Sequence, residues 1–432
     1  MGGVMIAAPR SGAGKTLLTL GILRAMRDSG IAVVPAKAGP DYIDPTYHAR
    51  AAGRQSFNLD PWAMRDATMR NLTAARGPLV VESAMGLFDG AADGSATAAD
   101  LAVRLGLNIV LILDCGGVGA SIAATLRGFA THRSDVRIAG VILNRVASER
   151  HQRTVLAAIE PVCAEHGVTI LGCIPRDQSL SLPSRHLGLV PAAEFEDVER
   201  VIRSLGALCA DRLDLGTLVQ LAERETGDAG DGGTIPPLGQ RIAIASDVAF
   251  AFAYPHMLNS WRAQRAQLTT FSPLSDEPPD PDADAVFLPG GYPELHAGQL
   301  SNAARFREGV KAAAERSATV YGECGGYMVL GERLRDAEGV DHPMLGLLPV
   351  STSFAEKRLH LGYRTASAQP AAPRLLRGSF RAHEFHHATI VEEGDGDALF
   401  SVTDAEGVQL PDAGRVRGSV AGSFIHLIDR AP

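Results

Sequence analysis

Short runs of β-branched and aliphatic residues recur through the first 205 residues, and a longer, more polar stretch follows each of them. A run that is apolar on both faces predicts a strand buried between two layers, because a half-exposed strand alternates apolar and polar positions. Such strands separated by helices are typical of a parallel, doubly wound sheet, so the sequence predicts an α/β domain. The predicted strands are residues 4–8, 31–37, 79–83, 109–114, 138–144 and 170–174.

A break in this pattern separates two predicted domains. After a helical stretch at residues 213–225, residues 226–240 lose all periodicity and are crowded with Gly, Pro and Asp, as in a linker. We therefore expect one α/β domain over residues 1–225 and a second over residues 241–432. The second domain starts with apolar strands at Arg241–Ala245, Ala285–Leu288 and residues 319–321. Beyond Pro343 the pattern indicates only short strand-like pieces.

Length and composition agree with two cytoplasmic domains. The chain has 432 residues, more than one ordinary hydrophobic core supports, and 46% of them are apolar, enough to fill two cores. A net charge of -8 disfavours binding to nucleic acid, because that requires a concentrated Lys/Arg surface. Five widely spaced cysteines without a CxxC pair indicate a reducing compartment. The chain starts almost at once with a predicted strand and has no apolar run of about 18 residues, so we expect neither a signal peptide nor a membrane span.

A phosphate-binding loop follows the first predicted strand. The segment PRSGAGKT places Gly12, Ala13, Gly14, Lys15 and Thr16 between a strand and a helix that begins near Lys15. Glycines let backbone N–H groups approach phosphate oxygens, and Lys and Thr suit the terminal phosphates and magnesium, so we expect ATP to bind here. Pro9 stands where a P-loop usually has its first glycine. The alternative is a glycine-rich turn before a helix.

Magnesium requires oxygen ligands in addition to Thr16, and two carboxylates follow predicted strands. Asp41 lies in KAGPDYIDP, and Glu82 ends a buried strand where an unpaired charge would be costly. The carboxyl ends of parallel strands surround the ligand crevice, so we expect Thr16, Asp41 and Glu82 to converge on Mg²⁺. Asp41 could instead cap a turn. Asp89, in the loop MGLFDG, could contact metal or substrate, or cap its own loop.

A cysteine site is predicted in the second domain. Cys324 lies in a glycine-rich corner between a short strand and an apolar, helix-like segment, where a thiol can be exposed and its thiolate favoured. His426, near the end of the apolar run 422–427, is the candidate base. The N–H groups of Gly291 and Gly325 could stabilise an oxyanion. The other cysteines have no comparable corner and are expected to be buried apolar residues; they are Cys115, Cys163, Cys173 and Cys209.

These segments resemble known families over nearly the whole chain. The C-terminal half resembles the class I glutamine amidotransferases, in which cysteine and histidine release ammonia from glutamine, although Ile428 occupies the position of their usual acidic third member. The N-terminal half resembles dethiobiotin synthetase. Together the two halves resemble the cobyrinic acid a,c-diamide synthase family, which includes the enzymes acting on hydrogenobyrinic acid. The shared segments are APRSGAGKT, KAGPDYIDPTYH, NLDPW, VESAMGLFDG, LPGGYPEL, YGECGGYMVLG, LHLGYR and HEFHH.

This resemblance implies ATP- and glutamine-dependent amidation of the a and c carboxylates of a corrinoid through acyl phosphates, in cobalamin biosynthesis. It implies a role at the synthetase site for Asp41, Asp44, Glu82 and Asp89, with Tyr42 and Ile43 beside the substrate. We assign Asp44 and Asp89 to the substrate. The sequence does not distinguish cobalt-containing from cobalt-free substrates, and it is compatible with a homodimer.

Three other interpretations remain open. The segment HEFHH, with His383, His386 and His387, has a spacing found in metal sites; the resemblance makes it a glutaminase-domain segment near the interface or the substrate, and a purely structural role is also open. The specificity could be that of cobyric acid synthase or of a nickel-tetrapyrrole a,c-diamide synthase. A P-loop ATPase switch would have no need for Cys324, Gly291 and His426.

Overall fold

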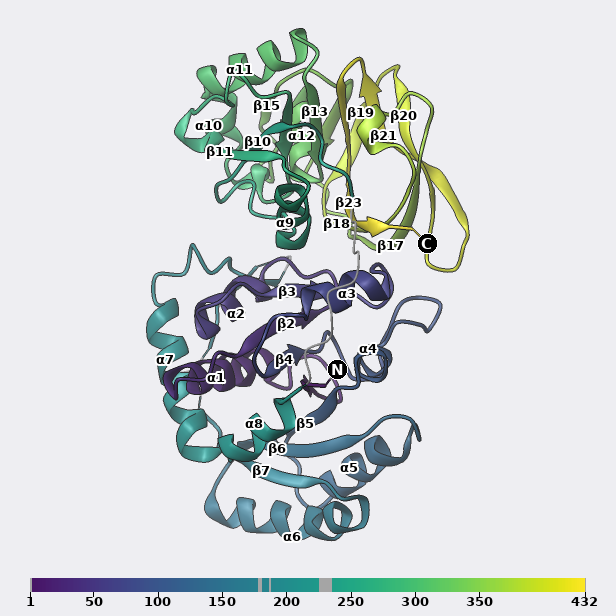
Figure 1. The fold of residues 1–432 in the computed structure, drawn as a ribbon. Helices are drawn as coiled ribbons and strands as arrows, with labels where there is room; N and C mark the ends of the chain where they lie inside the picture. Colours follow the sequence, from purple (N-terminus) through teal and green to yellow (C-terminus); the bar gives the residue numbers. More distant parts are fainter. Residues whose placement is uncertain (1, 178–180, 186–187, 225–234, 432) are drawn as a thin grey trace. The chain divides into compact units, whose positions relative to one another are not determined.

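The computed structural model describes residues 2–177, 181–185, 188–224 and 235–431, and it divides into two compact units (Figure 1). Unit 1 comprises Met1–Pro61 and Asp66–Gly232, and unit 2 comprises Gly233–Pro432 together with the short segment Trp62–Arg65. Of the predicted linker at residues 226–240, residues 226–234 lie outside the described residues.

Unit 1 is built on a seven-stranded sheet in the order β3-β2-β4-β1-β5-β6-β7. Every pairing in this sheet is parallel, which confirms the predicted doubly wound α/β fold. The strands are β1 Val4–Ala7, β2 Val34–Ala38, β3 Phe57–Leu59, β4 Leu79–Glu82, β5 Asn108–Asp114, β6 Ile138–Val146 and β7 Thr169–Pro175. The sequence pattern missed the edge strand β3, because three residues are too few to show a period.

Helices cover both faces of this sheet. Helix α1 packs against α2 and α7 on one face, whereas α5 packs against α6 on the other (Figure 1). The helices are α1 Lys15–Asp28, α2 Asp44–Ala52, α3 Asp66–Leu72, α4 Ala98–Leu105, α5 Ile122–Thr131, α6 Glu149–His166, α7 Val198–Arg212 and α8 Leu215–Ala222. A two-stranded ladder pairs β8 Ser184–Arg185 with β9 Gly188–Leu189. The loops after β1, β2 and β4 therefore lie at the same edge of the sheet, the carboxyl ends of neighbouring strands.

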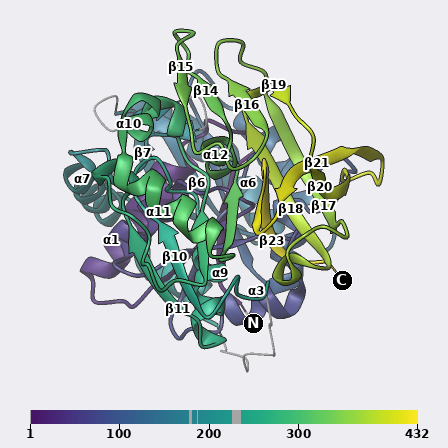
Figure 2. The same ribbon diagram turned by 90° about the horizontal axis from the view of Figure 1, so that it is seen from above.

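Unit 2 contains a ten-stranded mixed sheet in the order β11-β10-β12-β13-β22-β21-β20-β17-β18-β23. The first five strands pair in parallel and the remainder pair antiparallel, and Figure 2 shows β17, β18, β20 and β21 side by side. The strands are β10 Arg241–Ala245, β11 Gln267–Phe271, β12 Ala285–Leu288, β13 Thr319–Glu323, β17 His360–Ala368, β18 Ser379–His386, β20 Asp397–Thr403, β21 Gln409–Arg417, β22 Val420–Ser423 and β23 Ile425–Arg430.

Helices and a smaller sheet complete unit 2. The smaller sheet has the order β15-β14-β16-β19, and its strands are β14 Arg333–Arg335, β15 Asp341–Pro343, β16 Val350–Ser353 and β19 Thr389–Glu393. The helices are α9 Pro255–Ala263, α10 Ala297–Asn302, α11 Ala304–Glu315 and α12 Gly325–Leu330, with short 3₁₀ turns η1 Pro273–Ser275, η2 Pro293–Leu295 and η3 Arg374–Leu376. A continuous apolar core runs from α11 across the parallel strands to α12 and includes Phe306, Val320 and Tyr327. Among the described residues, no helix combines the length and hydropathy needed to cross a bilayer.

The segment Trp62–Arg65 is held in unit 2 by aromatic and ionic contacts. The Trp62 ring stacks on Tyr363, with centroids 4.7 Å apart, and the Arg381 guanidinium lies 4.3 Å from the Trp62 ring centroid. Arg65 binds both carboxylate oxygens of Asp429, through Nη2 at 2.8 Å and Nε at 3.2 Å, and its backbone N–H binds the same carboxylate. Asp429 has no solvent exposure, so Arg65 provides the charge partner that a buried carboxylate requires.

Arg65→Ala should destabilise unit 2 by roughly 3–5 kcal/mol, because it leaves the buried Asp429 carboxylate without a guanidinium. Urea denaturation followed by a tryptophan-independent probe such as far-UV circular dichroism measures this loss. The matched control is Arg335→Ala, which breaks a half-exposed bidentate pair with Asp341 and should cost about 1 kcal/mol or less. Equal losses in the two variants would contradict a special role for Arg65.

Candidate functional site

The phosphate loop joins β1 to α1, and α1 begins at Lys15 as predicted. Gly12 and Gly14 have φ angles of 76° and 94°, a region that favours glycine. A Cβ on Gly14 would also overlap the side-chain amide of Asn144, which donates a hydrogen bond of 2.8 Å to the carbonyl of Ala13. Asn144, on β6, therefore supports the loop, a contact that sequence reasoning missed.

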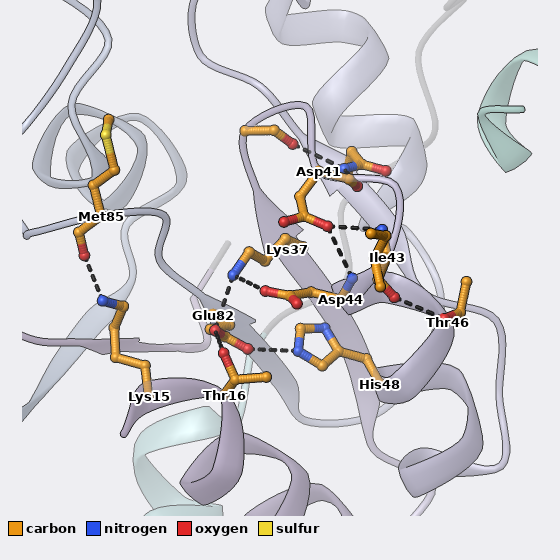
Figure 3. A network of polar contacts seen from close by, with 12 residues as sticks. Lys15, Thr16, Lys37, Asp41, Ile43, Asp44, Thr46, His48, Glu82 and Met85 are labelled. Carbon is orange, nitrogen blue, oxygen red and sulfur yellow. Dashed lines mark hydrogen bonds and ion pairs between the residues drawn. The ribbon is translucent and has the colours of Figure 1, made fainter. Parts of the chain in front are cut away.

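Lys15 is tied to backbone carbonyls of two loops. Its Nζ donates to the carbonyl of Met85, after β4 (Figure 3). It also donates to the carbonyl of Arg10 at 3.3 Å. Burial, reinforced by the nearby Lys37 ammonium, lowers the pKa of Lys15. The lysine is thus held at the edge of the sheet where β1 and β4 end.

Glu82 is the hub of a buried polar network (Figure 3). Its Oε1 accepts hydrogen bonds from Thr16 Oγ1 at 2.7 Å and from Lys37 Nζ at 2.8 Å. Its Oε2 lies 2.6 Å from His48 Nε2. Burial would raise the pKa of Glu82, but the Lys37 ammonium and the hydrogen bond to His48 outweigh it, so the pKa lies well below its ordinary value. The structure therefore brings Thr16 and Glu82 together, around a carboxylate that stays ionised.

Lys37 and Asp44 form a second buried ion pair beside Glu82. Lys37 Nζ donates to Asp44 Oδ2 at 2.5 Å, and both side chains are buried. Burial would lower the pKa of Lys37, but the carboxylates of Asp44 and Glu82 raise it above its ordinary value. Burial, with a contribution from Asp41, raises the pKa of Asp44 to about 6. The predicted substrate residue Asp44 thus lies within the same network as the phosphate loop.

Asp41 and Asp89 make loop-capping contacts. Asp41 Oδ1 accepts the backbone N–H groups of Ile43 at 2.7 Å and Asp44 at 2.8 Å, at the start of α2. Asp89 Oδ2 accepts the N–H of Gly86 at 2.8 Å. Both contacts are those expected if Asp41 caps a turn and Asp89 caps its own loop. A metal or substrate role for either residue stays a prediction. Tyr42 and Ile43 lie in the loop between β2 and α2.

Sequence reasoning missed Lys37 and His48 at this site. Both lie in the segment KAGPDYIDPTYH, and a lysine near the end of a buried strand is a signal as informative as the glutamate that ends β4. His48 lies one turn into α2 after Asp44, on the same helical face, so that both side chains reach the network around Glu82.

Cys324 occupies a sharp corner between β13 and α12, as predicted. Its φ of 47° is unusual for a residue other than glycine, and such strained strand-to-helix turns often carry nucleophiles. The expected exposure of the thiol was wrong, because Cys324 is 2% exposed and packs in the core with Tyr327 and Phe424. Burial, followed by the nearby Glu294, raises the pKa of the thiol well above its ordinary value. The thiol is therefore protonated at neutral pH.

The other cysteines agree with their expected structural role. Cys115, Cys163 and Cys209 are buried and Cys173 is partly buried, and all are free thiols. Burial raises the pKa of each of these thiols.

His426 and Cys324 both lie next to Gly290. A Cβ placed on Gly290 would lie 2.5 Å from Cε1 of His426 and 3.3 Å from Cβ of Cys324. His426 lies on β23, opposite His383 on β18. Burial, with smaller effects from His383 and His386, lowers the pKa of His426 to about 3, so its imidazole is neutral at neutral pH.

Gly291 and Gly325 approach each other through their backbones. A Cβ on Gly325 would lie 3.0 Å from the backbone nitrogen of Gly291, and a Cβ on Gly291 would overlap the carbonyl of Ala249. Both positions therefore require glycine, and their amide groups lie close together beside Cys324. This arrangement is compatible with the predicted pair of oxyanion donors.

The histidines of HEFHH do not form the group suggested by their spacing. Within the described residues, the side chains that could share a metal ion are His360, Glu384 and His386, with donor atoms within 4.8 Å of one another. His383 and His387 are not in this group. Arg364 already binds Glu384, through Nη2 at 2.8 Å, and supplies a cation there.

Comparisons with known proteins agree with this division into two sites. Residues 4–190 match the model of the CobQ/CobB/MinD/ParA nucleotide binding domain, and residues 241–431 match that of the CobB/CobQ-like glutamine amidotransferase domain. A hydrogenobyrinate a,c-diamide synthase of Rhizobium meliloti (strain 1021) is 52% identical over 434 residues, which cover 99% of this chain and 99% of the relative. One of Rhodobacter capsulatus is 50% identical over 434 residues, covering 99% of this chain and 98% of the relative. With half of its residues identical over the full length of these relatives, the chain belongs to the hydrogenobyrinate a,c-diamide synthase family and joins a nucleotide-binding domain to a glutamine amidotransferase domain.

Proposed function

We propose that this chain uses ATP and glutamine to amidate the a and c side-chain carboxylates of a corrinoid, with hydrogenobyrinate as its substrate, in cobalamin biosynthesis. The observation that carries the proposal is the buried network in which the phosphate-loop residue Thr16 meets Glu82 and Lys37. Full-length similarity to relatives with that activity in their name supports the substrate and favours it over those of cobyric acid synthase and nickel-tetrapyrrole enzymes.

The synthetase reaction requires activation of the substrate carboxylate, because a carboxylate is a poor electrophile toward ammonia. A carboxylate oxygen of the substrate attacks the γ-phosphorus of ATP, the bond to ADP breaks, and an acyl phosphate forms. Ammonia then attacks the acyl carbon, phosphate leaves, and the nitrogen loses a proton to give the amide. Lys15 and Lys37 stabilise the negative charge that gathers around the transferred group, so catalysis is electrostatic and positional.

Magnesium fits the donor chemistry at the end of the phosphate loop. Thr16 and Glu82 offer hydroxyl and carboxylate oxygens that already lie 2.7 Å apart, and hard cations prefer such ligands. We assign these two residues to Mg²⁺, with Asp41 as the further ligand expected from the sequence. The ion would neutralise phosphate charge when bound to ATP.

The glutaminase reaction begins with a buried, protonated thiol. His426 is neutral and takes the proton of Cys324 as the sulfur attacks the glutamine carboxamide. The N–H groups of Gly291 and Gly325 stabilise the oxyanion, the bond to nitrogen breaks, and ammonia leaves with a proton returned by His426. Water then hydrolyses the thioester to glutamate and restores the thiol.

Cys324→Ala should lower glutamine-driven amidation by about a thousandfold or more, because the nucleophile is lost, and should leave ammonia-driven amidation within about twofold of wild type. Initial rates with each nitrogen source, followed by product chromatography, test this separation. Cys163→Ala, which removes a buried thiol of unit 1, is the matched control and should retain both activities. Normal glutamine use by Cys324→Ala would refute the assignment of the nucleophile.

Lys15→Ala and Glu82→Gln should each lower amidation by at least about a hundredfold with either nitrogen source, because both act before ammonia enters the reaction. ADP release and amide formation are measured together. Lys311→Ala, on α11 of unit 2, serves as a control for loss of a lysine. Removal of Mg²⁺ with a chelator should have the same effect as the two variants, and full activity without it would contradict the metal assignment.

Hydrogenobyrinate should be converted to an a,c-diamide in two steps. Mass spectrometry with fragmentation follows the number of amides and NMR gives their positions. Amidation of other side chains, or rapid reaction with a corrinoid that already carries the a and c amides, would contradict the proposed specificity.

A further inference from the structure

Glu323 lies next to both members of the cysteine site. It is the last residue of β13, directly before Cys324. Its Oε2 lies 3.8 Å from Nδ1 of His426, and both side chains are almost completely buried. The position two residues after the histidine holds Ile428, an apolar side chain. This carboxyl group, 3.8 Å from the imidazole, comes from the nucleophile's own strand.

The other oxygen of Glu323 is anchored. Oε1 accepts the backbone N–H of Leu427 at 3.2 Å and the hydroxyl of Tyr321 at 3.1 Å. Leu427 follows His426 on β23, so one carboxyl group binds the backbone beside the histidine and faces its ring. Rotation of Glu323 away from His426 would break two buried hydrogen bonds, which makes its present orientation costly to leave.

We propose that Glu323 is a positioning residue that orients His426 as the base for Cys324. This inference rests on the proposed glutaminase function. An N–H···O bond spans roughly 2.7–3.2 Å, so the pair must close by roughly 1 Å, and catalytic hydrogen bonds often tighten when substrate binds. A carboxylate that accepts from Nδ1–H keeps the proton-accepting lone pair on Nε2, and it stabilises the imidazolium that forms when the proton moves.

The surroundings of His426 disfavour a positive charge on its imidazole, and an ionised Glu323 would offset this effect. His383 and His386, on β18, act with burial to disfavour a positive charge on His426. Burial raises the pKa of Glu323 to about 8, and the bonds from Leu427 and Tyr321 only partly oppose this. An imidazolium at His426 would draw Glu323 toward its ionised form, so the two charges appear together and stabilise each other. The other titratable groups around the pair are Tyr321, Cys324, Glu294 and Glu384.

Glu323→Gln tests this role with almost no change in shape. The amide oxygen can still accept from Leu427, but the NH₂ group cannot accept from Nδ1–H or carry a negative charge. We expect kcat for glutamine hydrolysis to fall about a hundredfold, with ammonia-driven amidation and the melting temperature unchanged. ¹⁵N NMR of His426 should report loss of the Nδ1–H tautomer. In the wild type, we expect glutaminase activity to rise with pH as Glu323 ionises, and this rise should be absent from the pH profile of the variant. Glu323→Asp, which keeps the charge, should restore part of the rate.

Tyr321→Phe is the matched control, because it removes one anchor of Oε1 and keeps the carboxylate; it should cost less than about tenfold. Equal losses in Tyr321→Phe and Glu323→Gln, or a Glu323→Gln rate within twofold of wild type, would overturn the positioning role while Cys324→Ala still abolished glutamine use. If Cys324→Ala also kept glutamine use, the glutaminase assignment itself would fail.

Discussion

The carboxylate of Glu82 is the constraint on which the nucleotide site depends. It is fully buried at the end of β4, and a buried charge is tolerated only when paired and hydrogen-bonded. Its partners come from three other elements: Thr16 from α1, Lys37 from β2 and His48 from α2. One anion therefore fixes the phosphate loop, the central strands and helix α2 relative to one another.

Burial also determines the charge state of the cysteine site, but there it keeps the side chains neutral instead of enclosing a charge. Burial keeps the Cys324 thiol and the His426 imidazole neutral, so neither is charged before the reaction starts. In the proposed mechanism, charge appears only when a proton passes between them, in buried surroundings that strengthen any preorganised donor. In the proposed glutaminase mechanism, the thiolate therefore forms only during turnover.

Local patterns revealed most of the framework. Buried strands such as β10 and β12 have an apolar signal that ends sharply, so the sequence located them, and the glycine and lysine spacing located the phosphate loop. Contacts between residues far apart in the sequence have no comparable local pattern. The antiparallel strands from β17 to β21 are partly exposed and lack a clear period, and the contacts of Glu82 with Lys37 or of Glu323 with His426 join positions whose chemistry is ordinary until the fold brings them together. Exposure of Cys324 was misjudged because a corner in the backbone does not determine what packs over it.

The segment Trp62–Arg65 belongs structurally to unit 2, although it lies within the sequence of unit 1. It follows β3 and precedes α3 in the sequence, yet its indole and guanidinium groups complete the packing around Tyr363 and Asp429. A fragment that begins after the linker would lack the Arg65 guanidinium beside Asp429 and the indole that contacts Tyr363 and Arg381. Separating the two units by engineering would therefore require the segment Trp62–Arg65 to be kept with unit 2 or supplied as a separate peptide.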